Sequence, residues 1–250
     1  QAIGIYHEKA PHWAWFSQLK TNADTTLQCD YRYLSSLGLT ALSPPLTTPN
    51  ALNPGSASER NVIASLKPYI SDLKRYHQQF KIPAIDFTTV KRFDKRYRYH
   101  DAQKQQHLRT LIQQLGYHQL AIPQFAVADE VPELNAAELT RFSQSIAQLQ
   151  NAIPGASLVG QLNKPANKQI LSMFDTLLIN NSFGVSKEVI RDLQQQGKSV
   201  WLYNMGNQRA AAGFFLWKSQ AQGYLQWHGR MPTGAPYNPL DGRESDFQMI

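Results

Sequence analysis

Two adjacent acids, Asp129 and Glu130, have the residue type and setting best suited to chemistry in this sequence. They follow an unbroken apolar stretch, residues 125–128, which is typical of a buried strand that would deliver both acids to its end. Burial raises the pKa of a carboxyl group, and a second acid nearby raises one of the two further. A carboxyl group kept protonated in this way can donate to a glycosidic oxygen, the first requirement of glycoside hydrolysis. The alternative is an ordinary loop acid followed by a turn acid.

The elements that would position these acids alternate along the chain. Short apolar runs are followed by longer stretches of helical period, which predicts parallel βαβ units. The eight runs cover residues 2–6, 40–42, 84–88, 120–128, 157–162, 176–179, 199–203 and 223–227. Eight such units in 250 residues predict a (β/α)8, TIM-like barrel, and no strand leads into the Gly-x-Gly-x-x-Gly loop of an open doubly wound sheet.

The end of the chain departs from this pattern. After Trp227 only a tail rich in Pro and Gly remains, so we expect the eighth helix to be absent or irregular. We expect residues 1–250 to form one catalytic barrel domain. Because the chain opens at Gln1 without a Met or an apolar signal segment, we expect it to be an excised or processed part of a longer protein.

Several helices carry recognisable signals at their ends. Asn135 and Glu138 have the spacing of a capping box, in which each side chain bonds the backbone N–H of the other. Ser186 predicts the start of a helix that ends at Gly197. We also expect a short helix near residues 168–173 and a longer one over 209–220.

The active sites of such barrels lie at the C-terminal ends of the strands. Polar and aromatic side chains gather at the ends of the expected strands, and sugars are bound by amides and carboxylates together with stacked rings. We therefore expect a substrate-binding role for Glu8, Asp86, Asn163, Asn180, Tyr203, Trp227 and His228. For each aromatic residue, simple packing in the core is the alternative.

A basic segment follows the third expected strand. The formal net charge of the chain is +7, and between residues 91 and 109 seven basic side chains stand against Asp94 and Asp101. The stretch 91–99, KRFDKRYRY, interleaves these charges with aromatic rings. It can be a solvated loop, a subsite for an acidic polysaccharide that includes Lys95 and Arg96, or a nucleic-acid site. Nucleic acid is disfavoured because no nucleic-acid-binding motif surrounds the segment.

The remaining composition excludes several classes of protein. Cys29 is the single cysteine and cannot form an internal disulfide, and no apolar run approaches the roughly 18 residues of a membrane helix. The seven histidines show no His-Glu-x-x-His spacing, and there is no Gly-x-Ser-x-Gly or Walker motif. We therefore expect no metal and no cofactor. The expected action on a polysaccharide or oligosaccharide favours a secreted, periplasmic or cell-surface location. The oligomeric state is left open.

Three stretches resemble glycoside hydrolase family 123 and its DUF4091-like relatives. Residues 125–132, FAVADEVP, look like the strand 4 Asp-Glu segment of these families. Residues 200–227, VWLYNMGNQRAAAGFFLWKSQAQGYLQW, are similar to their seventh strand, a helix bearing Trp, and their eighth strand. Residues 241–246, DGRESD, resemble the loop after that strand. Val131 departs from the family, which usually has proline there, as does Asn204-Met205 in strand 7.

The resemblance implies hydrolysis of β-linked N-acetylhexosaminides, in which the acetamido oxygen of the substrate attacks the anomeric carbon. Glu130 would then be the general acid/base, Asp129 would orient the acetamide, and Tyr203 and Trp227 would line its pocket. Two alternatives stay open. One is a catalytically silent barrel that binds an anionic polysaccharide, and the other is a two-carboxylate glycosidase that pairs Glu130 with Glu8 or Asp86.

Overall fold

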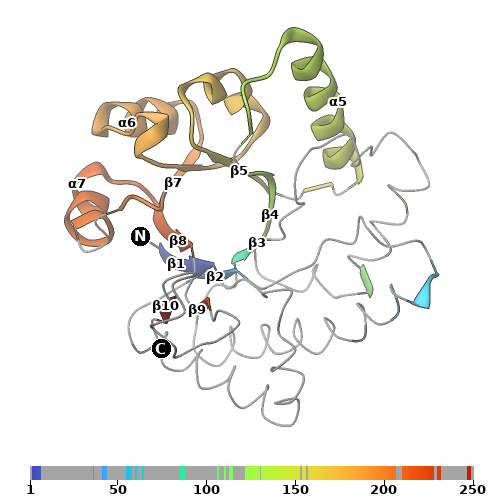
Figure 1. The fold of residues 1–250 in the computed structure, drawn as a ribbon, viewed down its shortest axis with the longest axis horizontal. Coiled ribbons are helices and arrows are strands. Elements are labelled where there is room, and N and C mark those ends of the chain that lie inside the picture. Colours follow the sequence, from blue (N-terminus) through green and yellow to red (C-terminus); the bar gives the residue numbers. More distant parts are fainter. Residues whose placement is uncertain are drawn as a thin grey trace, which may run out of the picture.

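A computed structural model gives the arrangement of the elements (Figure 1). It describes residues 2–6, 36, 41–43, 55–57, 60, 64, 85–87, 106, 110, 113–114, 122–129, 131–152, 154–155, 157–206, 210–227, 230–231 and 247–248. Side chains are described mainly between residues 131 and 225. The expected helix and loop residues between the first, second and third strands lie outside this part of the chain, apart from a few single positions.

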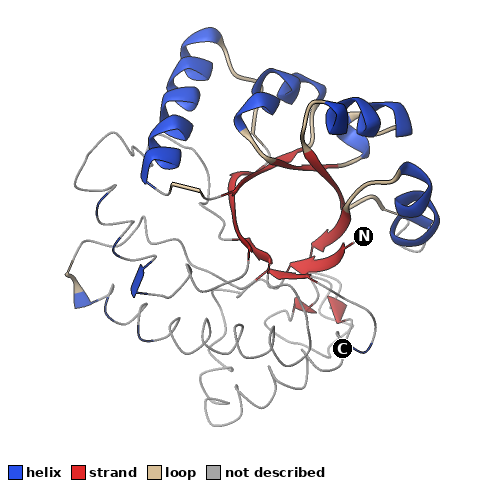
Figure 2. Cartoon of the chain, turned by 180° about the vertical axis from the view of Figure 1, so that it is seen from behind, coloured by secondary structure: helices blue, strands red, loops and turns tan. Residues whose placement is uncertain are grey.

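Eight parallel strands form one sheet in the order β2-β1-β8-β7-β6-β5-β4-β3. The strands are β1 (Ala2–Tyr6), β2 (Ala41–Ser43), β3 (Ile85–Phe87), β4 (Ile122–Asp129), β5 (Ser157–Leu162), β6 (Thr176–Ile179), β7 (Ser199–Tyr203) and β8 (Gly223–Trp227). A separate antiparallel pair joins β9 (Arg230–Met231) to β10 (Phe247–Gln248). The two ends of the large sheet, β2 and β3, contact each other, and Figure 2 shows the strands around a ring.

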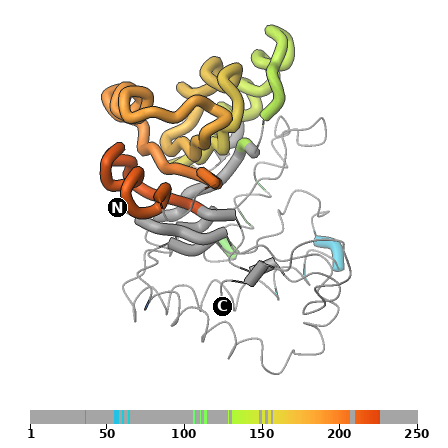
Figure 3. The backbone as a smooth tube through the Cα atoms, turned by 60° about the vertical axis from the view of Figure 1, so that its left-hand side comes forward, coloured from blue at the N-terminus to red at the C-terminus, as the bar shows by residue number. Residues whose placement is uncertain are grey.

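The described helices lie outside the strands that they connect (Figures 2 and 3). They are α5 (Ala136–Ala152), the 3-10 helices η3 (Pro165–Met173) and η4 (Asn181–Phe183), α6 (Lys187–Gln195), the π-helix η5 (Ala210–Phe215) and α7 (Leu216–Ser219). The expected short helix at 168–173 is thus a 3-10 helix that begins earlier, behind Pro165. The helix expected over 209–220 contains a π-helical first part.

The strands are staggered along the sheet in steps of two residues. At three of the seven junctions, first residues pair with each other, as Thr176 does with Ser199. At the other four, the first residue of one strand pairs with the third residue of its neighbour, namely Ser157 with Gln124, Thr176 with Val159, Gly223 with Trp201 and Ala41 with Gly4. Four steps of two residues amount to a stagger of eight residues.

Alternate residues of the central strands bury two different faces, as the two-residue period of a strand requires. One face packs against the helices and holds Leu158, Leu162, Leu177, Ile179, Val200 and Leu202 with Phe142, Ile170, Phe174, Ile190 and Leu193. The other side chains of the same strands are buried as well, including Val159, Leu178, Trp201, Tyr203 and Leu225, and are not part of that helix-side core. We call the face that they occupy the inner face.

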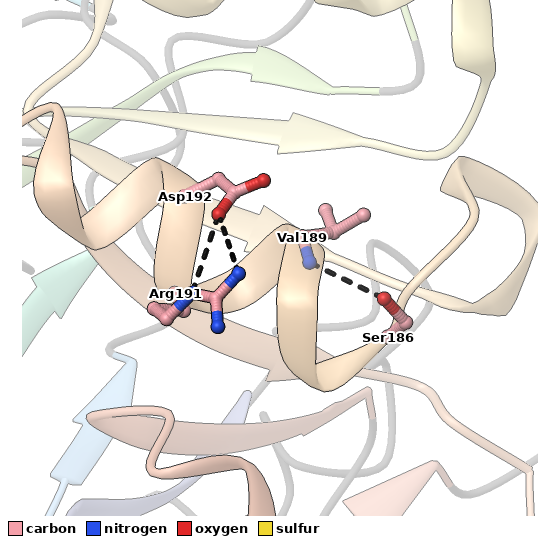
Figure 4. Close-up of polar contacts among 4 residues, drawn as sticks. All are labelled: Ser186, Val189, Arg191 and Asp192. Atoms are coloured by element: carbon pink, nitrogen blue, oxygen red, sulfur yellow. Dashed lines mark hydrogen bonds and ion pairs between the residues drawn. The ribbon is translucent and has the colours of Figure 1, made fainter.

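Local hydrogen bonds explain where two helices begin. The expected capping box of α5 is present: the Asn135 N–H donates to the Glu138 carboxylate, and the Glu138 N–H donates to Asn135 Oδ1, both at 3.0 Å. In α6, the Val189 N–H donates to the Ser186 hydroxyl at 3.2 Å (Figure 4). The Arg191–Asp192 ion pair beside it is exposed, so it contributes little. A backbone hydrogen bond to the Glu188 carboxylate, followed by a hydrogen bond from the Ser186 side chain to it, lowers the pKa of Glu188.

Candidate functional site

Several predicted site residues lie at the same end of the sheet, because all eight strands run parallel. Asp129, Tyr203 and Trp227 are the last residues of β4, β7 and β8. Asn163 and Asn180 directly follow β5 and β6. The C-terminal edge of the sheet therefore carries an acid, two aromatic residues and two amides, the mixture expected from the sequence.

Asp129 is brought to its register position by a bulge. The pairing of β4 with β5 shifts between Ala126 and Ala128, so that Asp129 pairs with Gln161. If the register did not shift, Ala128 would pair with Gln161 and Asp129 would pair with Leu162. A bulge of this kind re-aims the chain at the end of a strand, and bulges are common next to active sites.

Asp86 is at a different level. It pairs with Pro123, the second residue of β4, whereas Asp129 is the last residue of that strand. Six residues of β4 thus separate the level of Asp86 from that of Asp129, so the register does not bring these two acids together. Glu8, Lys95, Arg96, Glu130 and His228 lie outside the described residues, and the side chains of Asp86, Asp129 and Trp227 do too.

The side chain of Asn180 has a local structural partner. Its Oδ1 accepts hydrogen bonds from the N–H groups of Ser182 (3.0 Å) and Phe183 (3.3 Å), and so caps η4. The residue stays half-buried at the strand end. Its carbonyl oxygen is therefore already engaged, which leaves the amide NH2 as the part of the group that would bind a substrate.

Two amides at the end of β5 lack partners among the described residues. Gln161 is 1% exposed, and neither its Nε2 nor its Oε1 has a hydrogen-bond partner there. The Oδ1 of Asn163 is also buried and also has no hydrogen-bond partner there. An unpaired buried polar group costs about 1–3 kcal/mol. Gln161 is absent from the substrate-binding residues expected from the sequence, although a Gln inside an otherwise apolar strand is a signal that could have identified it.

The loop that follows the acid pair is held by a buried asparagine. Asn167, in η3, is fully buried, and its Nδ2 donates to the carbonyl oxygen of Val131 at 2.8 Å. Its Oδ1 accepts from the Lys164 N–H at 3.0 Å. Because Val131 directly follows Glu130, this side chain ties the chain just after the acid pair to the segment after β5.

We expect Asn167→Ala to lower the free energy of unfolding by about 1–3 kcal/mol, because it leaves the Val131 carbonyl and the Lys164 N–H without their partner. Chemical denaturation measures the change. Gln169→Ala is the matched control, since Gln169 bonds the same loop at Leu134 from an exposed position at 3.4 Å. Equal and small effects of both substitutions would contradict a specific role of Asn167.

The loop after β7 is also fastened to its surroundings. Asn204 has φ 44°, a left-handed conformation that few residues other than Gly and Asn adopt, and its N–H donates to the Leu225 carbonyl. Asn181 Nδ2 donates to the Met205 carbonyl at 3.0 Å. Burial raises the pKa of the Tyr224 hydroxyl, partly offset by its hydrogen bond with the Met205 backbone. Tyr224 therefore stays neutral at physiological pH.

The part of the chain that the structure describes lacks two features. There, no three His, Cys, Asp or Glu side chains come together in a way that could hold a metal ion. No helix of this part of the chain is both long and apolar enough to cross a membrane.

Comparison with known proteins relates the chain to solved structures alone. No family model and no curated protein matches the sequence. A β-glucuronidase from Ruminococcus gnavus superposes with a TM-score of 0.52 at 9% identity, over 94% of this chain and 44% of its own. A GH10 xylanase from Thermobacillus composti gives 0.51 at 10% identity, over 97% and 89%.

The chain spans about a quarter of a glycosyl hydrolase family 2 member from Bacteroides cellulosilyticus, at 12% identity and a TM-score of 0.49. It also spans less than half of the β-glucuronidase. At identities near 10%, these likenesses show the fold alone. The class that emerges is a parallel α/β fold of the kind found in TIM-barrel glycosidases. Within that class, the comparisons do not single out family 123, the narrower resemblance of the sequence.

Proposed function

We propose that this protein is a glycoside hydrolase that acts on an oligosaccharide or polysaccharide. The observation that carries the proposal is that Asp129 ends β4 and is followed directly in the sequence by Glu130, in a fold shared with glycosidases. Aromatic and amide residues at the ends of β5 to β8 are of the types that bind sugars, which supports the proposal. Since fold alone does not establish activity, the proposal rests on this site chemistry and needs a direct test.

We further propose that the sheet closes into a (β/α)8 barrel whose eighth helix is absent or irregular. The stagger of eight residues across the seven junctions supports closure. If β2 and β3 pair first residue to first residue, the total shear of the sheet is eight, which is the shear of a TIM barrel. The contact between β2 and β3 also supports it. Closure would place the inner face inside the barrel and the strand ends around one mouth.

In the proposed reaction, Glu130 donates its proton to the glycosidic oxygen while the acetamido oxygen of an N-acetylated substrate attacks the anomeric carbon, so that the glycosidic bond breaks and the leaving sugar departs as an alcohol. The Glu130 carboxylate then takes a proton from the water that attacks the resulting cyclic intermediate, which returns the acid to its protonated form. For an N-acetylated substrate, Asp129 orients the acetamido group, as the family 123 resemblance implies. We assign substrate binding to Glu8, Asn163, Asn180, Tyr203, Trp227 and His228 around the mouth. A substrate-binding role of Asp86 has less support, because its pairing with Pro123 places it nearer the beginning of β4 than the end. Lys95 and Arg96 would bind acidic groups of a longer glycan.

The test is incubation of the protein with a panel of N-acetylhexosaminide and uronic-acid oligosaccharides, with the products read by mass spectrometry. We expect shortened oligosaccharides from at least one of the two groups. Lys95→Ala with Arg96→Ala should weaken binding of uronic-acid members and flatten its salt dependence, because exposed charges are screened within about 10 Å at 0.1 M salt.

Other results would favour the remaining alternatives. Binding without any cleaved product would indicate a non-catalytic glycan-binding barrel. Cleavage of substrates that lack a 2-acetamido group as rapidly as those that carry one would indicate a two-carboxylate glycosidase, with Glu8 the stronger candidate for the second acid. If the protein neither binds nor cleaves any member of the panel, the proposal is contradicted.

A further inference from the structure

We propose that Gln161 forms a polar subsite on the inner face of the sheet, where its side-chain amide binds two adjacent hydroxyl groups of a sugar. This inference rests on the proposed function and names a part of the ligand that the acid pair does not address. The Gln161 amide is buried and has no hydrogen-bond partner among the described residues.

The packing of β5 shows which face Gln161 occupies. A Cβ atom added to Gly160 would lie 2.6 Å from the Phe174 ring, which belongs to the helix-side core. Leu158 and Leu162 belong to the same core. Because successive side chains of a strand alternate between its faces, Gln161 lies on the inner face.

The neighbours of Gln161 on this face come from the adjacent strands. Across the sheet it pairs with Leu178 on one side and with Asp129 on the other. The indole of Trp201 also lies on this face, because it covers Gly223 there, and Tyr203 follows two residues closer to the strand end. Among the described residues, the neighbours of the Gln161 amide in this layer are thus largely apolar and aromatic, and Gln161 is next in register to the predicted acid.

Such an amide is costly unless something pairs with it. The great majority of buried side-chain polar atoms have a partner, and each exception calls for a specific explanation. The Oδ1 of Asn163, two residues closer to the strand end, is also buried without a partner among the described residues. Unpaired acceptors and a donor grouped at the end of one strand indicate a site for a polar ligand group.

The chemistry of the amide selects that group. Gln161 presents one acceptor, Oε1, beside one donor, Nε2. Two hydroxyls on neighbouring sugar carbons match this arrangement, since one donates to Oε1 while the other accepts from Nε2. Because both atoms are shielded from solvent, we expect the sugar to reach them after side chains nearer the mouth move aside. A site built to bond a hydroxyl strongly rejects the analogue that lacks it, because its own groups are then left unpaired.

The experiment compares the wild-type chain with Gln161→Met by calorimetric titration. The probes are methyl β-D-glucoside, methyl N-acetyl-β-D-glucosaminide and methyl β-D-glucuronide, followed by the 3-deoxy and 4-deoxy forms of those that bind. We expect wild type to bind a deoxy form roughly 10- to 100-fold more weakly than its parent sugar. Gln161→Met should bind the parent more weakly and lose most of this discrimination. Leu178→Met, in the same layer, is the matched control and should keep it.

Thermal unfolding without sugar gives a second readout that does not depend on activity. If the amide is unpaired in the free protein, Gln161→Met should leave Tm unchanged or raise it, because an apolar side chain of similar size replaces an unsatisfied group. A clear fall in Tm would overturn the inference, as would binding of none of the probes by wild type or unchanged discrimination in the variant. If the wild-type chain discriminates between the probes but cleaves no oligosaccharide of the panel, the proposed hydrolase activity is overturned and the Gln161 subsite still holds.

Discussion

Replacement of Glu130 by glutamine is expected to slow cleavage of natural oligosaccharides by about 10²- to 10⁴-fold, the usual contribution of a general acid. Glutamine keeps the shape of the side chain but carries no titrating proton, so substrate affinity should change little. The measurement is kcat and KM on the oligosaccharide cleaved in the panel. Glu133→Gln is the matched control, because Glu133 is an exposed acid in the same loop, three residues further on.

Substrates with different leaving groups sharpen this test. Aryl glycosides need less protonation of the leaving group, so Glu130→Gln should affect them less than natural linkages. Asp129→Asn should instead slow every N-acetyl substrate, whatever its leaving group, if the acetamide is the nucleophile. Full activity of Glu130→Gln on a natural linkage would show that the acid is wrongly assigned. If Asp129→Asn slows substrates without a 2-acetamido group by an equal factor, the substrate-assisted mechanism is wrong, and the two-carboxylate alternative that pairs Glu130 with Glu8 or Asp86 replaces it.

A single methyl group added at Gly160 is expected to destabilise the fold by about 1–3 kcal/mol. The new Cβ of Gly160→Ala would lie 2.6 Å from the ring of Phe174, closer than real contacts allow. Phe174 is 1% exposed and packs edge-on against Phe142, so its ring has little freedom to move aside. Urea denaturation of the variant measures the loss.

A double-mutant cycle tests whether the Phe174 ring causes the loss of stability in Gly160→Ala. Phe174→Ala alone should cost about 3–5 kcal/mol, because it leaves a cavity in the helix-side core. In that background, Gly160→Ala should no longer destabilise, since the contact is gone. Gly213→Ala is the control: nothing lies within 4 Å of its added Cβ, so it should be neutral or stabilising by up to about 1 kcal/mol. An unchanged cost of Gly160→Ala without the ring would refute this account.

The sequence by itself determined much of the sheet. The runs at 157–162, 176–179, 199–203 and 223–227 are strands with those bounds, because continuous apolar segments of this length are buried on both faces. The capping box before α5 and the Ser186 cap of α6 were equally readable. Each depends on residues within three positions of one another, so local chemistry is sufficient.

The sequence also indicated that amides and aromatic residues gather at one end of the sheet. Asn163, Asn180, Tyr203 and Trp227 all lie at or just after the end of a strand, as the parallel arrangement predicts. Their roles did not follow from position. Asn180 caps η4, a bond that depends on how the chain turns after β6 and not on the residue type.

Other features depend on register and packing, which only the tertiary structure decided. The bulge in β4 sets Asp129 beside Gln161, and the pairing of β3 with β4 puts Asp86 six residues below that level. The buried Gln161 amide and the Asn167 bond to Val131 join segments far apart in sequence. The apolar pattern of a strand has a period of two residues, so it predicts the strand but not the residues with which the strand pairs. The register is set by the neighbouring strands, which the residues of one strand do not specify. Pairing between strands therefore had to be known before these residues could be assigned to one site.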